Sequence, residues 1–290
     1  MPLPNSDMEL TWITGAHGLI GNYLVQSAAQ LASQRRIRPL ARAQLDLRDF
    51  SALQREFKKD RPKLIIHCAA ITVVADAQKN PVLARQINVE VTRCLNDLAV
   101  DIPMIFFSTD LVFDGRKGDY AEMDAVNPLH IYGETKAEAE RLVLANPRHL
   151  VIRTSINGGK SITGNRAFNE QLRRSLQGAG QAMKLFTDEF RCPIPAEETA
   201  RAVWELAEKK CTGLYHVAGA EKLSRWQIGE LLAKDWPEIT AKLEPGSARE
   251  FPGPPRALDT SLNIAKVQAK LSQPLPGLTR WLSETRLGDF

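Results

Sequence analysis

Several features that mark particular classes of protein are missing from this sequence of 290 residues. Its four cysteines lie far apart without a C-x-x-C pair, so we expect neither a zinc site nor a disulfide framework. The longest apolar stretch, residues 64–75, is interrupted by polar side chains and falls short of the ~20 residues that span a bilayer. The N-terminal segment of eight residues is short and polar, so we expect neither a signal peptide nor a membrane anchor. We therefore expect a cytoplasmic protein.

Strong charge of one sign is also missing. The 38 Lys and Arg residues against 34 Asp and Glu residues leave a formal net charge of +4, with no basic run beyond residues 35–38. This composition does not indicate a nucleic-acid partner. A hydrophobic content of 43% suffices for a folded core. We expect the partner to be a small-molecule substrate, and neither a nucleic acid nor a membrane. We expect the protein itself to be a monomer or a homodimer.

Apolar runs and helical periods alternate through the first half of the chain. The sequence predicts strands at 10–14, 36–40, 63–68, 102–108 and 149–153, and helices at 19–32, 49–58, 81–99 and 131–145. This alternation is typical of an α/β fold with a Rossmann-type doubly wound parallel sheet. Loops rich in Pro and Gly follow, and predict a smaller C-terminal substrate lobe. We expect a nucleotide-binding domain over 1–155, with return segments near 183–217, and a lobe made mainly of 156–290.

The first predicted strand runs straight into a glycine-rich turn with the spacing G-x-x-G-x-x-G over residues 15–21. Glycines in that position allow a tight bend and close approach of the backbone to a pyrophosphate, and the free N–H groups of the next helix attract the anion. We expect the histidine of this turn to contribute its backbone N–H. The turn predicts contacts to a dinucleotide cofactor from Gly15, His17, Gly18, Leu19 and Ile20.

A tyrosine and a lysine four residues apart, Tyr132 and Lys136, share one face of a predicted helix. A free phenol has a pKa of about 10, and a neighbouring cation lowers it, so Tyr132 is a candidate proton donor. Thr109 ends the strand at 102–108, and its hydroxyl is a second donor for the same substrate oxygen. Such pairs also arise by chance on surfaces, but the glycine-rich turn favours the catalytic interpretation. His67, inside an apolar strand, is better explained as a hydrogen-bonded core residue.

Several blocks, taken in order, resemble the extended short-chain dehydrogenase/reductase superfamily, and most closely the dTDP-4-dehydrorhamnose reductase family. A more distant resemblance is to the regulatory beta subunit of methionine adenosyltransferase, which is not mainly an enzyme. The resemblance covers nearly the whole chain. The matching blocks include Thr14-Gly-Ala-His-Gly-Leu-Ile-Gly21, Leu45-Asp-Leu-Arg-Asp49, His67-Cys-Ala-Ala70, Ser108-Thr-Asp110, Tyr132-Gly-Glu-Thr-Lys136 and Arg153-Thr-Ser155.

The cofactor expected from these features is NADP(H), with NAD(H) possible. Many NAD enzymes carry an acidic residue after the second strand, whereas this chain has Arg42, whose guanidinium suits a 2′-phosphate. The alternative is that Arg42 is only a solvated surface residue. The resemblance further implies that Asp46 and Leu47 lie near the adenine and that Ala69 and Ala70 line the cofactor, although small residues also serve packing.

The substrate contacts implied by the resemblance are Asp110, Ile156 and Arg191. Asp110 could contact a sugar hydroxyl or cap the next turn, and Arg191 could meet a diphosphate or carboxylate or form a surface salt bridge. The family typically has Tyr after Ser-Thr-Asp and Trp after Arg-Thr-Ser, where this chain has Leu111 and Ile156. These departures point to a more aliphatic pocket. Leu111 also argues against a dehydratase, which needs a carboxylate at its position.

The function expected is an NADP(H)-dependent reductase of a ketone, such as a 4-keto sugar nucleotide. Tyr132 would donate the proton, Thr109 would hydrogen-bond the developing alkoxide, and Lys136 would lower the pKa of Tyr132 and bind the nicotinamide ribose. Two alternatives stay open: a non-catalytic NADP-binding regulatory subunit, and a sugar-nucleotide epimerase with tightly held NAD, which Arg42 disfavours. No metal is expected.

Overall fold

A six-stranded parallel sheet forms the centre of the computed structural model, which describes residues 8–178, 182–236, 242–252 and 255–285. The prediction that the first residues form neither a signal peptide nor a membrane anchor concerns residues 1–7, which lie outside the described ranges. The strand order is β10-β5-β4-β3-β1-β2, and every pairing in this sheet is parallel. The strands are β1 (Glu9–Thr14), β2 (Arg35–Leu40), β3 (Leu64–His67), β4 (Met104–Thr109), β5 (Leu150–Thr154) and β10 (Gly213–Val217). The predicted Rossmann-type α/β fold is confirmed.

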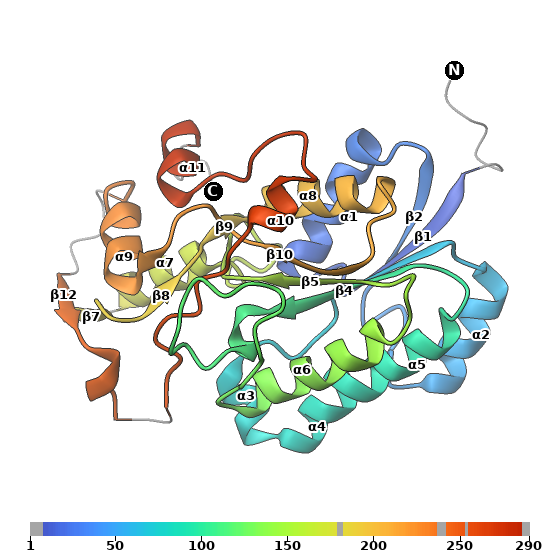
Figure 1. The fold of residues 1–290 in the computed structure, drawn as a ribbon, viewed down its shortest axis with the longest axis horizontal. Helices are drawn as coiled ribbons and strands as arrows, with labels where there is room; N and C mark the ends of the chain where they lie inside the picture. The colour runs from blue at the N-terminus through green and yellow to red at the C-terminus, as the bar shows by residue number, and fades with distance from the viewer. Residues whose placement is uncertain (1–7, 179–181, 237–241, 253–254, 286–290) are drawn as a thin grey trace.

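Helices cover both faces of this sheet (Figure 1). Helices α1 (Leu19–Leu31) and α8 (Ala196–Glu208) pack together on one face, while α2 (Phe50–Asp60), α5 (Val91–Leu98) and α6 (Ile131–Leu144) cover the other. Successive strand residues point to opposite faces. Trp12 and Phe106 accordingly join the core under α2, α5 and α6, whereas Ile13 and Ile105 join the core under α1 and α8. Strands β3, β4 and β5 are therefore buried on both faces, as their apolar sequences require, whereas the edge strand β2 is only partly buried.

The helix predicted over 81–99 is present but is not uniform. It runs as α4 (Pro81–Arg85), a π-helical turn (Gln86–Glu90) and α5, and an additional short helix, α3 (Val74–Lys79), precedes it. Asn80 caps α4 by accepting a hydrogen bond from Leu83 N. The π-helical turn carries Asn88, whose side chain bonds Ile71 N and the Thr135 hydroxyl. This turn fixes the segment after β3 against α6, next to the candidate site.

The second half of the chain builds a smaller lobe from segments that lie before and after its return to the sheet. Its helices α7 (Phe168–Gly178), α9 (Arg225–Ala233) and α11 (Leu278–Glu284) surround an apolar cluster that includes Leu232 and Trp281. Three two-stranded ladders complete the lobe. They pair β6 (Asn157–Gly158) with β9 (Ile194–Pro195), β7 (Met183–Phe186) with β12 (Leu243–Gly246), and β8 (Phe190–Arg191) with β11 (Leu223–Ser224).

Within the expected return segments near 183–217, only part of the chain reaches the large sheet. Strands β7 and β8 pair inside the lobe, and the return begins at α8 and ends with β10, beside which lies α10 (Ala265–Gln268). The division into two domains stays a prediction. Across the described ranges, no helix has both the length and the apolar character needed to cross a membrane.

Candidate active site

One cavity of about 800 Å³ runs along the carboxyl ends of β1 to β5. This edge is where parallel α/β sheets bind ligands. Segments that follow five different strands line the cavity, so it unites residues far apart in the sequence. Of the predicted site residues, it brings together Gly15, His17, Gly18, Leu19, Ile20, Arg42, Asp46, Leu47, Ala69, Ala70, Thr109, Asp110, Tyr132, Lys136 and Ile156. Arg191 is not among the lining residues.

The glycine-rich turn enters this cavity with a backbone that larger residues would disturb. Gly15 has a φ of +64°, and a Cβ there would lie 2.7 Å from Ala69 N. A Cβ on Gly21 would lie 2.4 Å from the Gly15 carbonyl oxygen. Helix α1 begins directly after Gly18, and among the residues that the structure describes no side chain caps its first N–H groups. Those free N–H groups therefore face the cavity as an anion-binding end of a helix.

The three predicted catalytic residues meet at the opposite end of the cavity. Thr109 is the last residue of β4, and Tyr132 and Lys136 lie one turn apart on α6. The α6 N-terminus is fixed by His130, whose Nδ1 accepts a hydrogen bond from Gly133 N at 3.3 Å. Both Tyr132 (7% exposed) and Lys136 (3% exposed) are buried, and the Thr109 side chain is close enough to Tyr132 to influence its pKa. The geometry therefore places two hydroxyl groups at one point.

The pKa of Tyr132 shifts in the direction opposite to the expected one. Burial raises it, a hydrogen bond with Thr109 lowers it in part, and the negative charge of Asp110 raises it further. Burial also lowers the pKa of Lys136 to about 7, against the opposing charge of Glu140. The Lys136 ammonium lies 3.9 Å from the centre of the Phe106 ring. The expected acidification of Tyr132 by Lys136 is thus wrong for this structure, because desolvation dominates, and Tyr132 is protonated at neutral pH.

His67 has the structural role that the sequence suggests. Its ring bonds the Thr14 hydroxyl at 2.7 Å and the Thr92 hydroxyl at 3.1 Å, and it is 1% exposed. Burial and the nearby charge of Lys136 lower the pKa of His67 to about 3, so it is neutral. His67 ties β3 to β1 and α5 behind the cavity.

The cavity end next to β2 carries two arginines around one carboxylate. The Arg48 guanidinium donates three hydrogen bonds to the Asp46 carboxylate, two from Nε at 2.9 and 3.1 Å and one from Nη2 at 2.5 Å, and Arg42 lies 3.7 Å from the same carboxylate. The hydrogen bond from Arg48 lowers the pKa of Asp46 to about 2. The Arg42 side chain is 77% exposed and is available to an anionic ligand. Arg38, by contrast, is held by Glu56 and Asp60 and does not line the cavity.

Asp110 and Arg191 form a buried network beside Thr109. Asp110 accepts hydrogen bonds from Ser155 Oγ at 2.8 Å and Thr260 Oγ1 at 3.2 Å, and lies 3.8 Å from Arg191 Nε. Arg191 is 4% exposed and pairs with Glu189, so the expected surface salt bridge is wrong. Its guanidinium also donates to two backbone carbonyls of the lobe. Arg191 therefore contacts the site through Asp110 and does not reach the cavity itself.

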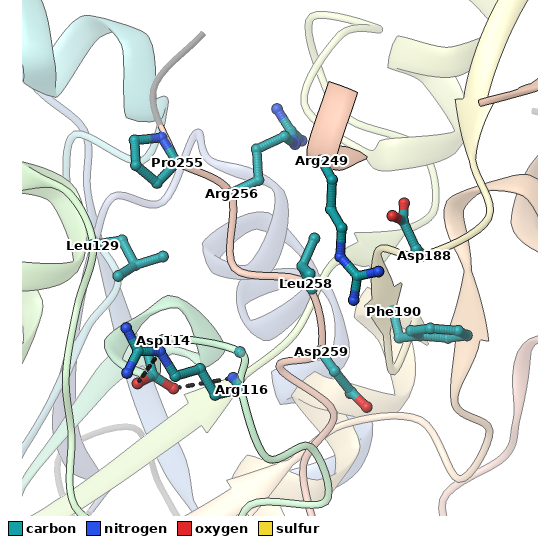
Figure 2. Close-up of a pocket in the computed structure, with 11 residues that line it drawn as sticks. Asp114, Arg116, Leu129, Asp188, Phe190, Arg249, Pro255, Arg256, Leu258 and Asp259 are labelled. Carbon is teal, nitrogen blue, oxygen red and sulfur yellow. Dashed lines mark hydrogen bonds and ion pairs between the residues drawn. The ribbon is translucent and has the colours of Figure 1, made fainter. Parts of the chain in front are cut away.

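A second cavity, of about 540 Å³, lies where residues 114–116 and 129 meet residues 188–190, 249 and 255–259 (Figure 2). Leu129, one residue before the His130 cap of α6, forms part of its wall. Arg256 pairs with the buried Glu189 and lies over the Phe186 and Phe251 rings. Arginine and aspartate side chains from separate segments form the polar lining, namely Arg116, Arg249, Arg256, Asp114, Asp188 and Asp259. The cavity thus offers both cationic and anionic groups near the N-terminus of α6.

Comparisons with known proteins agree with this arrangement. The family described as RmlD substrate binding domain matches residues 8–285. The chain belongs to the RmlD substrate binding domain family. A dTDP-4-dehydrorhamnose reductase from Sinorhizobium fredii is 29% identical over 94% of each chain. The methionine adenosyltransferase 2 subunit beta of Xenopus laevis is 27% identical over 88% of this chain and 80% of its own.

Solved structures give the same result for this RmlD family member. The dTDP-4-dehydrorhamnose reductase of Bacillus anthracis, solved in complex with NADP, has a TM-score of 0.87, with 25% identity over 98% of this chain and 100% of that one. A hypothetical dTDP-4-dehydrorhamnose reductase from Sulfolobus tokodaii has a TM-score of 0.82, with 30% identity over 93% and 97% of the two chains. The resemblance drawn from the sequence motifs is therefore confirmed.

Some cavity residues of this family member were given no role in the sequence interpretation. Arg48 could have been found from its place two residues after Asp46, and Ser108 from its place before Thr109. Ser108 Oγ is buried and, among the described residues, has no hydrogen-bond partner. Asn165 and Arg166 also line the cavity, from a loop of the lobe whose sequence carries no recognisable signal.

Proposed function

We propose that this chain is an NADP(H)-dependent reductase of a ketone, and that the ketone is a 4-keto sugar nucleotide or a similar polar carbonyl compound. The observation that carries the proposal is the meeting of Thr109, Tyr132 and Lys136 at one end of a cavity whose middle is a glycine-rich turn. A proton donor and an anion-binding turn in one cavity are the two requirements of nicotinamide-dependent carbonyl reduction.

The lining residues fit a dinucleotide in their chemistry. The glycine-rich turn supplies free backbone N–H groups, and the unpartnered Ser108 hydroxyl lies in the cavity wall. Arg42 and Arg48 would hold a 2′-phosphate at one end, and Lys136 would hold the ribose at the other. Relatives named as dTDP-4-dehydrorhamnose reductases, one of them solved with NADP, support the same assignment.

The nicotinamide, when bound, supplies the hydride that reduces the carbonyl carbon. Tyr132 donates the phenolic proton to the carbonyl oxygen, which becomes the alcohol hydroxyl. Its raised pKa keeps this proton in place before the reaction. Thr109 hydrogen-bonds the same oxygen and stabilises the developing negative charge. Lys136, whose pKa burial lowers to about 7, is placed to act as a proton source: its ammonium returns a proton to the phenolate that Tyr132 leaves behind, and solvent restores the ammonium.

Two features bear on the substrate: the cationic groups of the second cavity and the aliphatic residues of the first. Arg116, Arg249 and Arg256 line the second cavity, and Arg256 is linked to the Asp110 network through Glu189 and Arg191. Leu111 and Ile156 line the first cavity, at the positions where the family typically has Tyr and Trp. The phosphates of a sugar nucleotide would fit the arginines of the second cavity. A sugar with fewer hydroxyl groups would fit the aliphatic wall of the first.

A regulatory subunit is the second candidate, because the methionine adenosyltransferase beta subunits are relatives at 27% identity. The complete set of Thr109, Tyr132 and Lys136 favours the enzyme. An epimerase with permanently held NAD is disfavoured by the exposed Arg42 beside the adenosine end.

A screen of cofactor oxidation tests the proposal. Purified protein with NADPH is given 4-keto sugar nucleotides and simple polar ketones, and absorbance loss at the nicotinamide band is followed. We expect turnover with at least one carbonyl substrate. Tight NADPH binding without turnover of any of them would favour the regulatory subunit, and copurifying NAD would favour the epimerase.

A further inference from the structure

A loop of the substrate lobe, residues 159–167, closes against the start of helix α1. Ala167 packs with Leu19 and Tyr23 of α1, and Lys160 N donates a hydrogen bond to the Tyr23 hydroxyl at 3.0 Å. Arg166 lines the same cavity as the glycine-rich turn. The loop therefore forms a wall of the cavity at the turn, although it belongs to the other half of the chain.

One carboxylate makes four hydrogen bonds to this loop, which the Asn169 and Gln171 side chains also hold. Glu170, in the first turn of α7, accepts hydrogen bonds from Ser161 N at 2.7 Å, Ser161 Oγ at 2.5 Å, Arg166 N at 2.9 Å and Ala167 N at 3.0 Å. Ser161 Oγ in turn accepts a hydrogen bond from Arg166 N at 3.1 Å. The backbone N–H of Arg166 is thus held by two acceptors, which fixes the position of its Cα at the cavity wall.

The glycine-rich turn itself brings no cationic side chain to the cavity. Helix α1 has the sequence LIGNYLVQSAAQL, which contains no charged residue. Among the described residues, four cationic side chains line the cavity, and three of them lie away from the glycine-rich turn. Arg42 and Arg48 lie around Asp46, and Lys136 lies beside Tyr132. Arg166 is the fourth; it is exposed, and among the described residues its guanidinium has no ion-pair partner.

We propose that Arg166 binds the pyrophosphate of the dinucleotide cofactor, opposite the N–H groups of α1, and that Glu170 positions it by holding the loop. A guanidinium presents a planar fork of donors that matches phosphate oxygens. The N-terminus of α1 contributes partial positive charges and Arg166 contributes a full positive charge. The pyrophosphate would therefore be held between the glycine-rich turn and the loop 159–167. This inference rests on the proposed function, because it needs a dinucleotide in the cavity.

The test compares dissociation constants for NADPH and NADH, measured by fluorescence titration of the full-length protein. Both cofactors carry the pyrophosphate, so Arg166→Ala should weaken both equally, by about tenfold, which corresponds to about 1.4 kcal/mol. Arg42→Ala should weaken NADPH alone, since NADH lacks the 2′-phosphate. Adenosine 2′-monophosphate, which has no pyrophosphate, should bind the Arg166→Ala variant as it binds the unmodified protein.

Two further variants control for charge and folding. Arg174→Ala removes an equally exposed cation of α7 that does not line the cavity, and it should leave both constants unchanged. Arg166→Lys keeps the charge and should recover part of the lost affinity. Glu170→Gln keeps Arg166 but loosens the loop, and it should weaken both cofactors. The effect of Arg166→Ala should shrink as salt is raised, because an exposed ion pair is screened.

Unchanged affinity of Arg166→Ala for both cofactors, with normal binding by the unmodified protein, would overturn the role of Arg166 and leave the proposed function standing. A loss confined to NADPH would also overturn it, since Arg166 would then contact the 2′-phosphate. If the unmodified protein bound neither cofactor, the proposed function would fail and this inference with it.

Discussion

The buried carboxylate of Glu189 yields a quantitative prediction. Its side chain is fully buried and pairs with Arg191 at 3.1 Å, with Arg225 at 2.9 Å and with Arg256. Burial alone would raise the pKa of Glu189, but the charges of the three arginines hold it at about 2, below the ordinary 4.5. A lowering of this size corresponds to about 3 kcal/mol in favour of the ionised form in the folded protein.

We predict that Glu189→Gln, which keeps the size and removes the charge, lowers the free energy of unfolding by about 3 kcal/mol or more. Removing one partner of a buried ion pair generally costs ~3–5 kcal/mol, in agreement with the value from the pKa. The assay is thermal or urea unfolding at pH 7, compared with the unmodified protein. Glu284→Gln is the control, because the Glu284 pair with Arg280 is largely exposed and should contribute less than about 1 kcal/mol.

The dependence on pH has a defined sign. Because the folded-state pKa of Glu189 is lowered, its contribution is complete above the ordinary pKa of 4.5 and is lost as the pH falls toward 2. The Gln variant should lack this part of the acid sensitivity, so the two proteins should converge in stability at low pH. A loss at pH 7 no larger than that of Glu284→Gln would refute the reasoning and show that the arginines find other partners.

Three further predictions concern the cavity. Arg42→Ala should remove most of the preference for NADPH over NADH in fluorescence titrations, and equal affinities in the unmodified protein would contradict Arg42 as the phosphate ligand. The folded-state pKa of Lys136 is lowered from 10.5 to about 7, so the free energy of unfolding should rise between pH 7 and 10.5. Lys136→Met should lack this rise in thermal unfolding. The same dependence on pH in both proteins would contradict the lowered pKa of Lys136. Leu111→Tyr combined with Ile156→Trp should raise kcat/KM for dTDP-4-keto-rhamnose about ten- to hundredfold, whereas a value above ~10⁴ M⁻¹s⁻¹ in the unmodified chain would oppose an altered pocket.

Much of the first half of the fold could be predicted from local pattern. The strands are short apolar runs and the helices carry regular periods, so the expected and observed limits differ by one to a few residues. The π-helical turn at Gln86–Glu90 could not be foreseen, because Asn88 gains its partners, Ile71 and Thr135, only when the chain folds. The small ladders of the lobe are too short for a periodic signal to appear.

The candidate site divides in the same way. Residues within the glycine-rich turn and the Tyr132 helix were predictable because each motif is contiguous in sequence. The raised pKa of Tyr132 was not, since it depends on burial, and sequence spacing shows only that Lys136 shares its helix face. The burial of Arg191 and the approach of Arg166 to the glycine-rich turn also depend on tertiary packing between the two halves of the chain.

The central claim is that Tyr132 is the proton donor of a reductase, and one comparison tests it most directly. Turnover and NADPH affinity are measured for the unmodified protein and for Tyr132→Phe, with a carbonyl substrate found in the screen. The account predicts that turnover falls by ~10² to 10⁴ while the dissociation constant of NADPH stays within a few fold. Turnover by Tyr132→Phe at the unmodified rate would contradict it.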